Sequence, residues 1–341
     1  MTEKNVVLHT EDLKIGYKAK GGQETIVAEH IDVDLHSGEL ICLLGPNGSG
    51  KSTLIKTLAG VHSKLGGQIT VFNESIDLLS RKEIAHRLST VLTDRVTVGN
   101  LSVYNLVAFG RSPYTGWLGS LSKEDEEKVR WAIEATGLKE FVNRDINKLS
   151  DGELQKVMIA RALAQDTSVI LLDEPTAHLD LPNRVEIIRL LRKLAHETGK
   201  GILLSTHELD LALKAGDRIW LMNREKELFK GVPEDLVLNG TFEEVFKKDS
   251  FDFDIETGSF KIHRHKDKIV SVNGDPVPVF WTRRALEREG YRVVEGEGAS
   301  LTITAQTTKE SYRWQINDKL SIINARSVYE LLSALRKENL S

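Results

Sequence analysis

The sequence predicts an α/β protein with a mostly parallel sheet, and three observations lead to this fold class. Short apolar runs at residues 40–44, 168–172 and 201–205 alternate with helical patterns, as in sheets whose strands are joined by crossover helices. Residues 45–53 read GPNGSGKST and match G-x-x-x-x-G-K-[ST], the Walker A phosphate loop. The chain of 341 residues, 40% apolar and 28% charged, can bury the core of one large or two ordinary domains.

Composition argues against several classes of protein. The formal charge of -4 disfavours a basic surface for nucleic acid, and no apolar run approaches the roughly 18 residues that a membrane helix needs. The N-terminus shows no signal-peptide pattern. Cys42 is the only cysteine, so no internal disulfide forms, and its apolar neighbours predict a packed side chain. We expect a cytoplasmic protein, with any membrane role peripheral.

Antiparallel strands are expected ahead of the phosphate loop. Residues 6–8, 13–17 and 25–35 alternate apolar and polar side chains, which is the period of half-buried strands, and a Gly-Gly pair marks a turn. Tyr17 ends one of these strands. On pattern alone it is either an edge aromatic or a ring that stacks on a base.

The Walker A loop has the composition that phosphate binding requires. Its glycines allow a tight turn that points backbone N–H groups at phosphate oxygens, and the helix expected at residues 54–59 adds the positive end of its dipole. Lys51 places a flexible charge on the outer phosphates, and Ser52 offers a hydroxyl to Mg²⁺. The residues predicted to bind nucleotide here are Gly45, Pro46, Asn47, Gly48, Ser49, Gly50, Lys51, Ser52 and Thr53.

Strand and helix patterns continue after this loop. Residues 66–72 and 88–92 predict strands, and a capping box at residues 80–83 opens a short helix between them. Two longer helices are expected at residues 102–109 and 122–136. A connection that contains proline and glycine, RSPYTGWLG, separates them.

Residues 149–153 read LSDGE and precede a helical pattern at residues 154–164. Ser150, with Glu153 three residues later, forms a capping box, and Gly152 lies in the same turn. A capped helix start that contains glycine is also a site for an anion. The structural and functional interpretations agree here, because one backbone geometry serves both.

The strand at residues 168–172 ends in an acidic pair, which is the Walker B pattern. Asp173 is placed to hold Mg²⁺ directly or through water. Glu174 is placed to orient or deprotonate a water in line with the γ-phosphate. An acidic pair alone is usually a solvated loop, and the Walker A loop upstream favours the functional interpretation.

The last elements of this region complete the sheet. A helix begins at Asp180 and ends at Gly199, and the strand at residues 201–205 leads into His207. His207 therefore follows a buried strand at the edge where open α/β sheets bind ligands. Residues 218–222 and 227–231 predict a closing hairpin.

In this order and spacing, the motifs resemble those of the ATP-binding cassette (ABC) ATPases over residues 6–245. The resemblance implies a P-loop NTPase with a RecA-like core, an antiparallel β subdomain and a helical subdomain near residues 88–164. Together these would form a nucleotide-binding domain at residues 1–248. The resemblance also implies a head-to-tail dimer, in which each ATP lies between the Walker A loop of one copy and Ser150 and Gly152 of the other.

The resemblance implies roles for single residues as well. Glu174 and His207 are the expected catalytic residues, and His207 contacts the γ-phosphate. Asp180 lies in the loop that links the two ATP sites, and Tyr17 stacks on adenine. ATP and Mg²⁺ are the expected cofactors, with Ser52 and Asp173 at the metal.

Two positions depart from the family pattern. LSDGE replaces the usual LSGGQ but keeps Ser150 and Gly152. The Gln that normally follows the strand at residues 88–92, where it joins Mg²⁺ and the attacking water to the membrane partner, is Thr93 here. We expect Thr93, or Asp94 beside it, to take this role through a water, because a Thr side chain reaches less far.

Residues 101–117 resemble a segment of the ATPases that serve iron-siderophore, haem and cobalamin importers. That segment carries Gly-Arg-x-Pro-x-x-Gly, matched by Gly110, Arg111, Pro113 and Gly116. An ordinary helix and turn is the alternative interpretation. The resemblance implies an ATPase subunit on the inner face of the cell membrane, bound to integral membrane permease subunits and served indirectly by a substrate-binding protein.

Two other functions stay open. One is an ABC ATPase for another cargo or for an exporter. The other is a soluble ATP-gated clamp on DNA or ribosomes. Lys51 and Ser150 are 99 positions apart without heptads between them, and no second Walker A loop occurs, so the clamp is disfavoured.

Residues 249–341 predict a small α+β accessory domain, too aromatic for a disordered tail. The sequence leaves three roles open for this domain: sensing a ligand, aiding dimerisation, or covering the edge of the ATPase domain. His263 and His265 alternate on one expected strand, and without further ligands a solvated strand face is favoured over a metal site. Strands are expected at residues 260–263, 269–272, 292–295, 301–305 and 312–316, and helices at 278–289 and 325–337.

Overall fold

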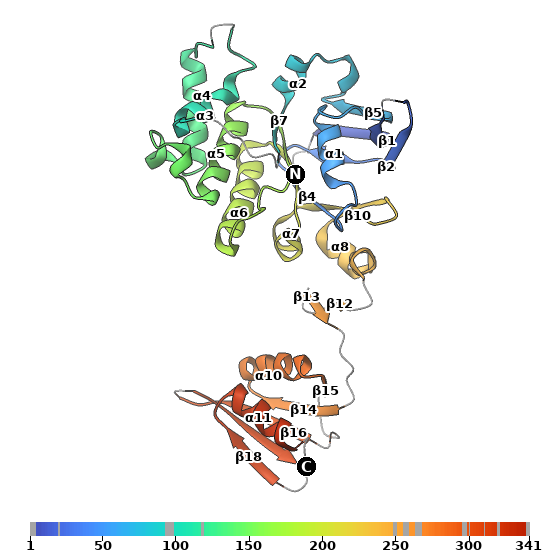
Figure 1. Cartoon of the computed structure of the whole chain (residues 1–341), viewed down its shortest axis with the longest axis vertical. Helices are drawn as coiled ribbons and strands as arrows, with labels where there is room; N and C mark the ends of the chain where they lie inside the picture. The colour runs from blue at the N-terminus through green and yellow to red at the C-terminus, as the bar shows by residue number, and fades with distance from the viewer. Residues whose placement is uncertain are drawn as a thin grey trace. The chain divides into compact units, whose positions relative to one another are not determined.

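The chain forms two compact units, Met1–Lys248 with Phe253–Ser259, and Asp249–Asp252 with Phe260–Ser341. Figure 1 shows the larger unit in blue to yellow and the smaller one in orange to red. Each has its own sheets and its own hydrophobic core. This computed structural model describes residues 5–19, 21–92, 99–116, 119–247, 251–254, 259–262, 268–294, 299, 301–309, 311–318 and 321–338.

A six-stranded sheet, in the order β11-β10-β4-β9-β8-β7, is the centre of the larger unit. Each neighbouring pair among β10, β4, β9, β8 and β7 is parallel, and β11 pairs antiparallel with β10. This confirms the predicted sheet and its closing hairpin. Cys42 is buried in β4, as predicted. The strands are β4 (Leu40–Leu44), β7 (Leu88–Val91), β8 (Val169–Leu172), β9 (Gly201–Ser205), β10 (Arg218–Met222) and β11 (Leu228–Gly231).

Helices that alternate with these strands along the chain pack on the sheet. α1 and α6 contact β9, α6 and α7 contact β4, and α8 and α9 contact the β10-β11 hairpin. As predicted, Asp180 caps α6 at its start, and Gly199 ends it with a left-handed φ of 70°. The helices are α1 (Lys51–Leu58), α6 (Leu181–Thr198), α7 (Leu209–Ala215), α8 (Pro233–Leu238) and α9 (Thr241–Phe246).

A second, antiparallel sheet has the order β2-β1-β5-β6, with β3 also paired to β1. The strands expected at residues 6–8 and 13–17 are one long strand, and the strand expected at residues 25–35 divides in two. Asp12 of β1 and His30 of β2 have positive φ values of 45° and 56°, and both lie at register shifts, so β1 continues past Asp12 as one strand. The strands are β1 (Val6–Lys18), β2 (Glu24–Ile31), β3 (Asp34–His36), β5 (Gly66–Val71) and β6 (Glu74–Ser75).

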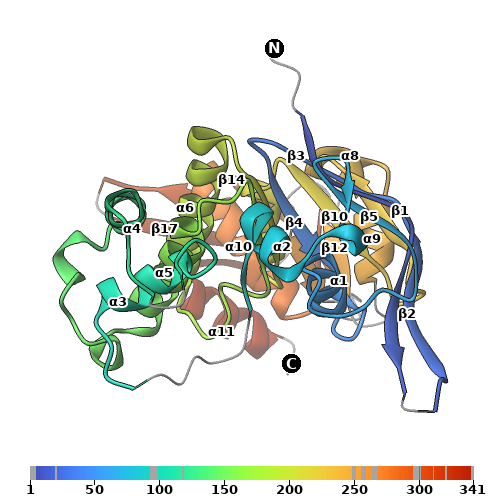
Figure 2. The same cartoon turned by 90° about the horizontal axis from the view of Figure 1, so that it is seen from above.

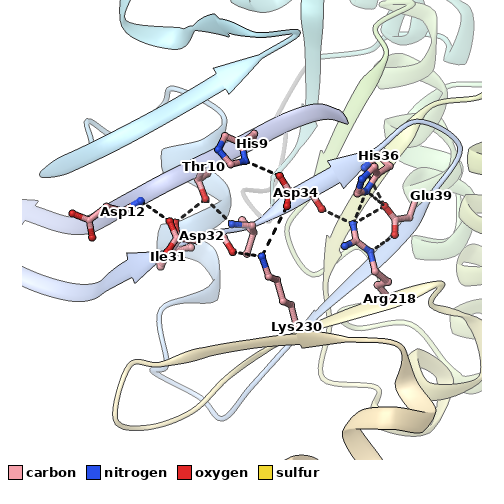
Figure 3. Close-up of polar contacts among 11 residues, drawn as sticks. His9, Thr10, Asp12, Ile31, Asp32, Asp34, His36, Glu39, Arg218 and Lys230 are labelled. Atoms are coloured by element: carbon pink, nitrogen blue, oxygen red, sulfur yellow. Dashed lines mark hydrogen bonds and ion pairs between the residues drawn. The ribbon is translucent and has the colours of Figure 1, made fainter. Parts of the chain in front are cut away.

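Ionic side chains join the two sheets at the edge opposite the phosphate loop (Figure 3). Arg218, at the start of β10, places Nη2 2.9 Å from Glu39 Oε2 and 2.8 Å from His36 Nδ1. Lys230 of β11 donates to the carbonyl oxygen of Asp32 at 2.7 Å. These contacts hold the β3 region against the β10-β11 hairpin.

The segment between β7 and β8 is helical, as expected, and α3, α4 and α5 pack on one another. Ser122 and Ser150 close capping boxes at α4 and α5, and the predicted capping box at Ser80 opens α2. Within the described ranges, no helix combines the length and apolarity needed to cross a bilayer. Before β7 lie the 3-10 helix η1 (Ile76–Leu78) and α2 (Arg81–Arg87). Between β7 and β8 lie the α-helices α3 (Val103–Ala108), α4 (Lys123–Ala135) and α5 (Asp151–Ala164) and the 3-10 helices η2 (Phe109–Arg111), η3 (Lys139–Phe141) and η4 (Ile146–Lys148).

The smaller unit contains a mixed sheet in the order β15-β14-β16-β17-β18. α10 packs on β14, β15 and β16, and α11 packs on β17 and β18. Trp314 lies in the resulting core and donates from Nε1 to Thr282 Oγ1 at 2.6 Å. The elements are β14 (Lys268–Gly274), α10 (Pro276–Arg288), β15 (Tyr291–Val294), β16 (Leu301–Thr307), β17 (Tyr312–Asp318), β18 (Ser321–Ala325) and α11 (Val328–Glu338), preceded by the paired strands β12 (Phe251–Asp254) and β13 (Ser259–Ile262).

One expectation for this unit is wrong. The sequence patterns do not predict β18, and they start the last helix at Ala325, whereas α11 begins at Val328. Ala325 pairs with Trp314 across the sheet and is buried there, so pairing between strands overrides the helical period. His263 and His265 lie outside the described residues.

Candidate functional site

The Walker A loop connects β4 to α1 and depends on its glycines. Gly45, Gly48 and Gly50 have φ values of 151°, 81° and 106°, in the range where a side chain is strained. A Cβ on Gly45 would lie 2.4 Å from the carbonyl oxygen of Met222. Asn47 and Gly48 are exposed at the tip of the loop, whereas Ser49 is buried.

Lys51 is held inside the loop. Its ammonium donates to the carbonyl oxygens of Gly45 at 2.9 Å and Pro46 at 3.1 Å, and the residue is only 5% exposed. Burial lowers the pKa of Lys51, partly offset by the carboxylates of Glu174 and Asp173. A fixed cation beside the loop amides is suited to phosphate oxygens.

Asp173, at the end of β8, is bonded to the start of α1 and to the end of β9 at the carboxyl edge of the sheet. Ser52 Oγ, at the start of α1, donates to Asp173 Oδ1 at 3.0 Å, and Ser205 Oγ, at the end of β9, donates to the same oxygen at 2.8 Å. Asp173 is 2% exposed. Mg²⁺ is usually bound by one or two protein oxygens together with phosphate oxygens, and Ser52 and Asp173 supply such oxygens.

The structure brings together Glu174 and His207, the two residues expected to be catalytic. Glu174 Oε1 and His207 Nε2 lie 2.7 Å apart, although the residues are 33 positions apart. Glu174 has a left-handed φ of 50°, which is uncommon for a residue with a side chain, and its N–H donates to Ser205 Oγ at 2.9 Å. Ser205 thus orients both acidic residues, and no motif in the sequence indicates this role.

Tyr17 lies at the same site. Its hydroxyl shares a hydrogen bond of 2.9 Å with Thr53 Oγ1 in α1. The ring is 49% exposed and contacts the edge of His62, with 5.6 Å between ring centroids. A ring anchored at its hydroxyl and open on one side is available for stacking on a base.

Ser150, Gly152 and Asp180 form a second cluster. Ser150, exposed at the start of α5, donates from Oγ to Glu153 Oε2 at 2.9 Å. A Cβ on Gly152 would lie 2.7 Å from Asn183 Oδ1, and Asn183 donates from Nδ2 to Asp180 Oδ1 at 2.6 Å. Asn183 therefore links the start of α5 to the cap of α6, a contact that the sequence does not reveal.

A cavity of about 450 Å³ lies between the sheet edge and α5. Asp173 and Glu174 line one side, and Asp151 and Gln155 of α5 line another. Thr93 and Asp94 lie outside the described residues. The described part of the chain thus places the Walker residues, Tyr17 and His207 in one region, and the start of α5 across a cavity from them.

Family models match two parts of the chain. The ABC transporter model matches residues 28–177, and the model of the iron ABC transporter C-terminal domain matches residues 266–336. An uncharacterised ABC transporter ATP-binding protein of Methanocaldococcus jannaschii is 35% identical over 262 residues, covering 77% of this chain and 89% of that protein. The iron(3+)-hydroxamate import ATP-binding protein of Bacillus subtilis is 34% identical over 243 residues, covering 71% and 88%. The ferric enterobactin transport ATP-binding protein of Escherichia coli is 34% identical over 246 residues, covering 72% and 89%.

Solved structures share the fold. An ABC transporter described as metal-chelate type, in an inward-facing conformation, has a TM-score of 0.61 and 27% identity, over 71% of this chain and 89% of that one. A dimeric cassette of a bacterial ABC transporter has a TM-score of 0.57 and 26% identity, over 66% and 98%. The predicted P-loop fold is confirmed. This chain belongs to the ABC transporter ATP-binding family, whose members bind and hydrolyse ATP.

Proposed function

We propose that this protein is the ATPase subunit of an importer for an iron chelate, haem or a cobalamin. The observation that carries the ATPase role is the network of Ser52, Asp173, Ser205, Glu174 and His207 beside the Walker A loop. Phosphoryl transfer depends mainly on positioning and charge neutralisation. The network supplies positioning, and Lys51 beside it supplies positive charge.

The residues of the site have separate proposed parts. Lys51 and the loop amides would bind the phosphates, while Ser52 and Asp173 would hold Mg²⁺, which would supply further positive charge beside the phosphates. Glu174 orients and activates the attacking water, and His207 contacts the γ-phosphate. Glu174 Oε1 and His207 Nε2 lie 2.7 Å apart, which supports the proposal that both act at the γ-phosphate. Tyr17 stacks on the adenine.

The remaining predicted residues are proposed to act in a dimer. Ser150 and Gly152 of one copy would close the ATP site of the other, and Asp180 would link the two sites. The similarity to a dimeric bacterial cassette supports this arrangement. ATP then joins the copies and its hydrolysis releases them. Thr93, or Asp94, is proposed to replace the missing Gln at the metal.

The iron C-terminal model and the names of the relatives support the class of cargo. These relatives import iron(3+)-hydroxamate and transport ferric enterobactin. We propose a nucleotide-binding domain at residues 1–248 and an accessory domain at residues 249–341. The protein would work on the inner face of the cell membrane with permease subunits and, indirectly, a substrate-binding protein, without nucleic acid.

The substitution Glu174→Gln tests the catalytic role. It removes the carboxylate charge, so we expect ATP turnover to fall about 100-fold or more while an ATP-bound dimer accumulates. Size-exclusion chromatography with light scattering, in saturating Mg-ATP, measures the dimer. Glu126→Gln makes the same change on the exposed side of α4 and should leave turnover unchanged. A monomeric Glu174→Gln protein under these conditions would contradict the role.

The cargo is tested with the membrane partner. Co-purification with a permease from neighbouring genes, followed by ATPase assays with loaded substrate-binding protein, identifies the cargo that stimulates turnover. Stimulation by a ferric siderophore, haem or a cobalamin is the expected result. Stimulation only by cargo of another class would contradict the proposal.

A further inference from the structure

Arg184 connects two segments of the site that are far apart in the sequence. It lies in the first turn of α6, which packs on α5 and α7, and Figure 1 and Figure 2 both show α6 beside α5. Its guanidinium donates from Nε to the carbonyl oxygen of Leu179 at 2.6 Å and from Nη1 to Glu208 Oε1 at 2.6 Å. One side chain therefore contacts the residue before Asp180 and the residue after His207.

The loop that leads to Asp180 has a strained backbone. Glu174 and His178 have left-handed φ values of 50° and 65°, which residues with a side chain rarely adopt. Such conformations persist where the surrounding contacts hold them in place. Arg184 donates to the carbonyl oxygen one residue after His178, so this bond acts directly beside the second strained position.

The turn between β9 and α7, which carries His207, is bonded to this loop at several places. The buried hydroxyls of Thr176 and Thr206 lie 3.5 Å apart, and the bond from Arg184 to Glu208 is a further link. Glu208 occupies the N-cap position of α7, yet within residues 119–247, all of which are described, no N–H of α7 donates to its side chain. Its carboxylate is directed at α6 instead of at its own helix.

We propose that Arg184 is a positioning residue of the ATP site, which holds the turn that carries His207 against the loop that carries Asp180. A guanidinium suits this task because its N–H groups point in fixed directions and can meet two acceptors at once. The inference rests on the proposed function, in which His207 contacts the γ-phosphate and Asp180 links the two ATP sites. In that dimer, a shift of the Asp180 loop would reach His207 through the two bonds of one side chain.

A second arginine of α6 provides a matched control. Arg192, about two turns further along, donates from Nη1 to the carbonyl oxygen of Lys214 at 3.3 Å, and its Nη2 lies 3.7 Å from Asp217 Oδ1. It therefore joins α6 to the end of α7 by the same two kinds of contact. Asp217 also accepts from the N–H of Leu40, the first residue of β4, which places this control at the edge of the sheet opposite the phosphate loop. The side chains of Arg184 and Arg192 are 34% and 44% exposed.

Steady-state ATP turnover of the full-length chain tests the role. Arg184→Met keeps an unbranched side chain and removes both donors. We expect kcat to fall about tenfold, because a small misplacement of a reacting group slows the chemical step. KM for ATP should change less than about twofold, because the Walker A loop is untouched. Arg192→Met should keep the kcat of the parent protein, and Arg184→Lys, which retains the charge beside Glu208, should recover part of the loss.

Glu208→Gln probes the same bond from its other end. It keeps the shape of the side chain and removes its charge, so it tests the inference even where Arg184→Met does not fold. We expect kcat to fall several-fold. The double variant should be no slower than Arg184→Met alone, because both substitutions remove one shared contact. Losses that multiply in the double variant would show that the two residues act separately and would overturn the inference.

Two further results would also overturn it. Equal losses of kcat in Arg184→Met and Arg192→Met would assign the effect to the packing of α6. If Arg184→Met and Glu208→Gln both keep the kcat of the parent protein while His207→Ala loses it, the inference is wrong and the proposed function stands. If His207→Ala itself retains that kcat, the proposed role of His207 is wrong, and the inference that depends on it is wrong as well.

Discussion

Single residues at the ATP site depend on partners far away in the sequence. Asp173 and Glu174 are adjacent, yet Ser205, the last residue of another strand, determines how both are held. Glu174 also has a left-handed backbone that an isolated chain would avoid. The geometry of this acidic pair is therefore maintained by bonds between neighbouring strand ends.

Ser205→Ala tests this dependence. It removes the hydroxyl that donates to Asp173 and accepts from the Glu174 N–H, and losing such a buried bond costs about 1–3 kcal/mol. If this cost falls on the transition state, we expect kcat to drop about tenfold with a smaller change in KM. Ser205→Thr keeps the hydroxyl and should retain most activity. An Ala variant with the kcat of the parent protein would show that the hydroxyl does not position the site.

Gly152→Ala tests the contact between α5 and α6. The new Cβ would lie 2.7 Å from Asn183 Oδ1, and Asn183 is held by Asp180, so one of these groups must move. Overpacking of this kind costs about 1–3 kcal/mol. We expect lower ATP turnover in Gly152→Ala and partial recovery in Gly152→Ala with Asn183→Ala, measured as a double-mutant cycle. The absence of recovery would argue against the contact.

At the scale of elements, a buried ion pair ties η2 and α4 to α5. Arg111 donates from Nε to Asp125 Oδ1 at 2.8 Å and from Nη1 to the carbonyl oxygen of Ala164 at 2.9 Å. Its guanidinium also lies 3.8 Å from the ring centroid of Tyr114. Arg111 and Asp125 are 4% and 6% exposed. The Gly-Arg-x-Pro segment is thus part of the packing of the helical region, whatever it contacts outside.

Asp125→Asn tests that packing and its pH dependence. Burial alone would raise the pKa of Asp125, but hydrogen bonds from Ser122 and Arg111 outweigh it and lower the pKa below the ordinary value. A lowered pKa gives stability that is present above the unfolded pKa, near 3.9, and is lost as the pH falls through the folded pKa.

We expect Asp125→Asn to destabilise the protein by about 3 kcal/mol at pH 7, because the Arg111 charge stays buried. The stability of the variant should also fall less between pH 5 and pH 3 than that of the parent protein. Urea unfolding at each pH measures both effects. Glu126→Gln breaks an exposed pair with Arg130 and should cost about 0.5 kcal/mol. Equal losses in the two variants would contradict the role of the buried pair.

At the scale of the whole molecule, the two units have separate cores. Ile69 belongs to the core of the larger unit and Ile303 to that of the smaller one, and both are at most 1% exposed. We expect two thermal transitions. Ile303→Ala should lower the midpoint of one and Ile69→Ala the midpoint of the other, because each substitution reduces the free energy of unfolding of its own unit by about 2–5 kcal/mol. Mg-ATP should raise only the transition that Ile69→Ala lowers. Scanning calorimetry measures all three effects, and a single transition that shifts in both variants would show that the units unfold together.

The sequence alone determined the features that short stretches encode. The Walker A turn, the capping boxes at Ser80 and Ser150, the strand at residues 201–205 and the end of α6 at Gly199 are present where the patterns predict them. Backbone preference and side chain to backbone bonds act over a few residues, so the local sequence contains the necessary information.

Only the tertiary structure decided which distant residues meet. It paired Ser205 with Asp173, placed Asn183 against Gly152, continued β1 past Asp12, and made a strand of residues 321–325. It also left Phe280 and Trp281 exposed, although their spacing in α10 would equally suit a buried face. These outcomes depend on the shapes that separate elements present to one another when they pack, and no local pattern records them.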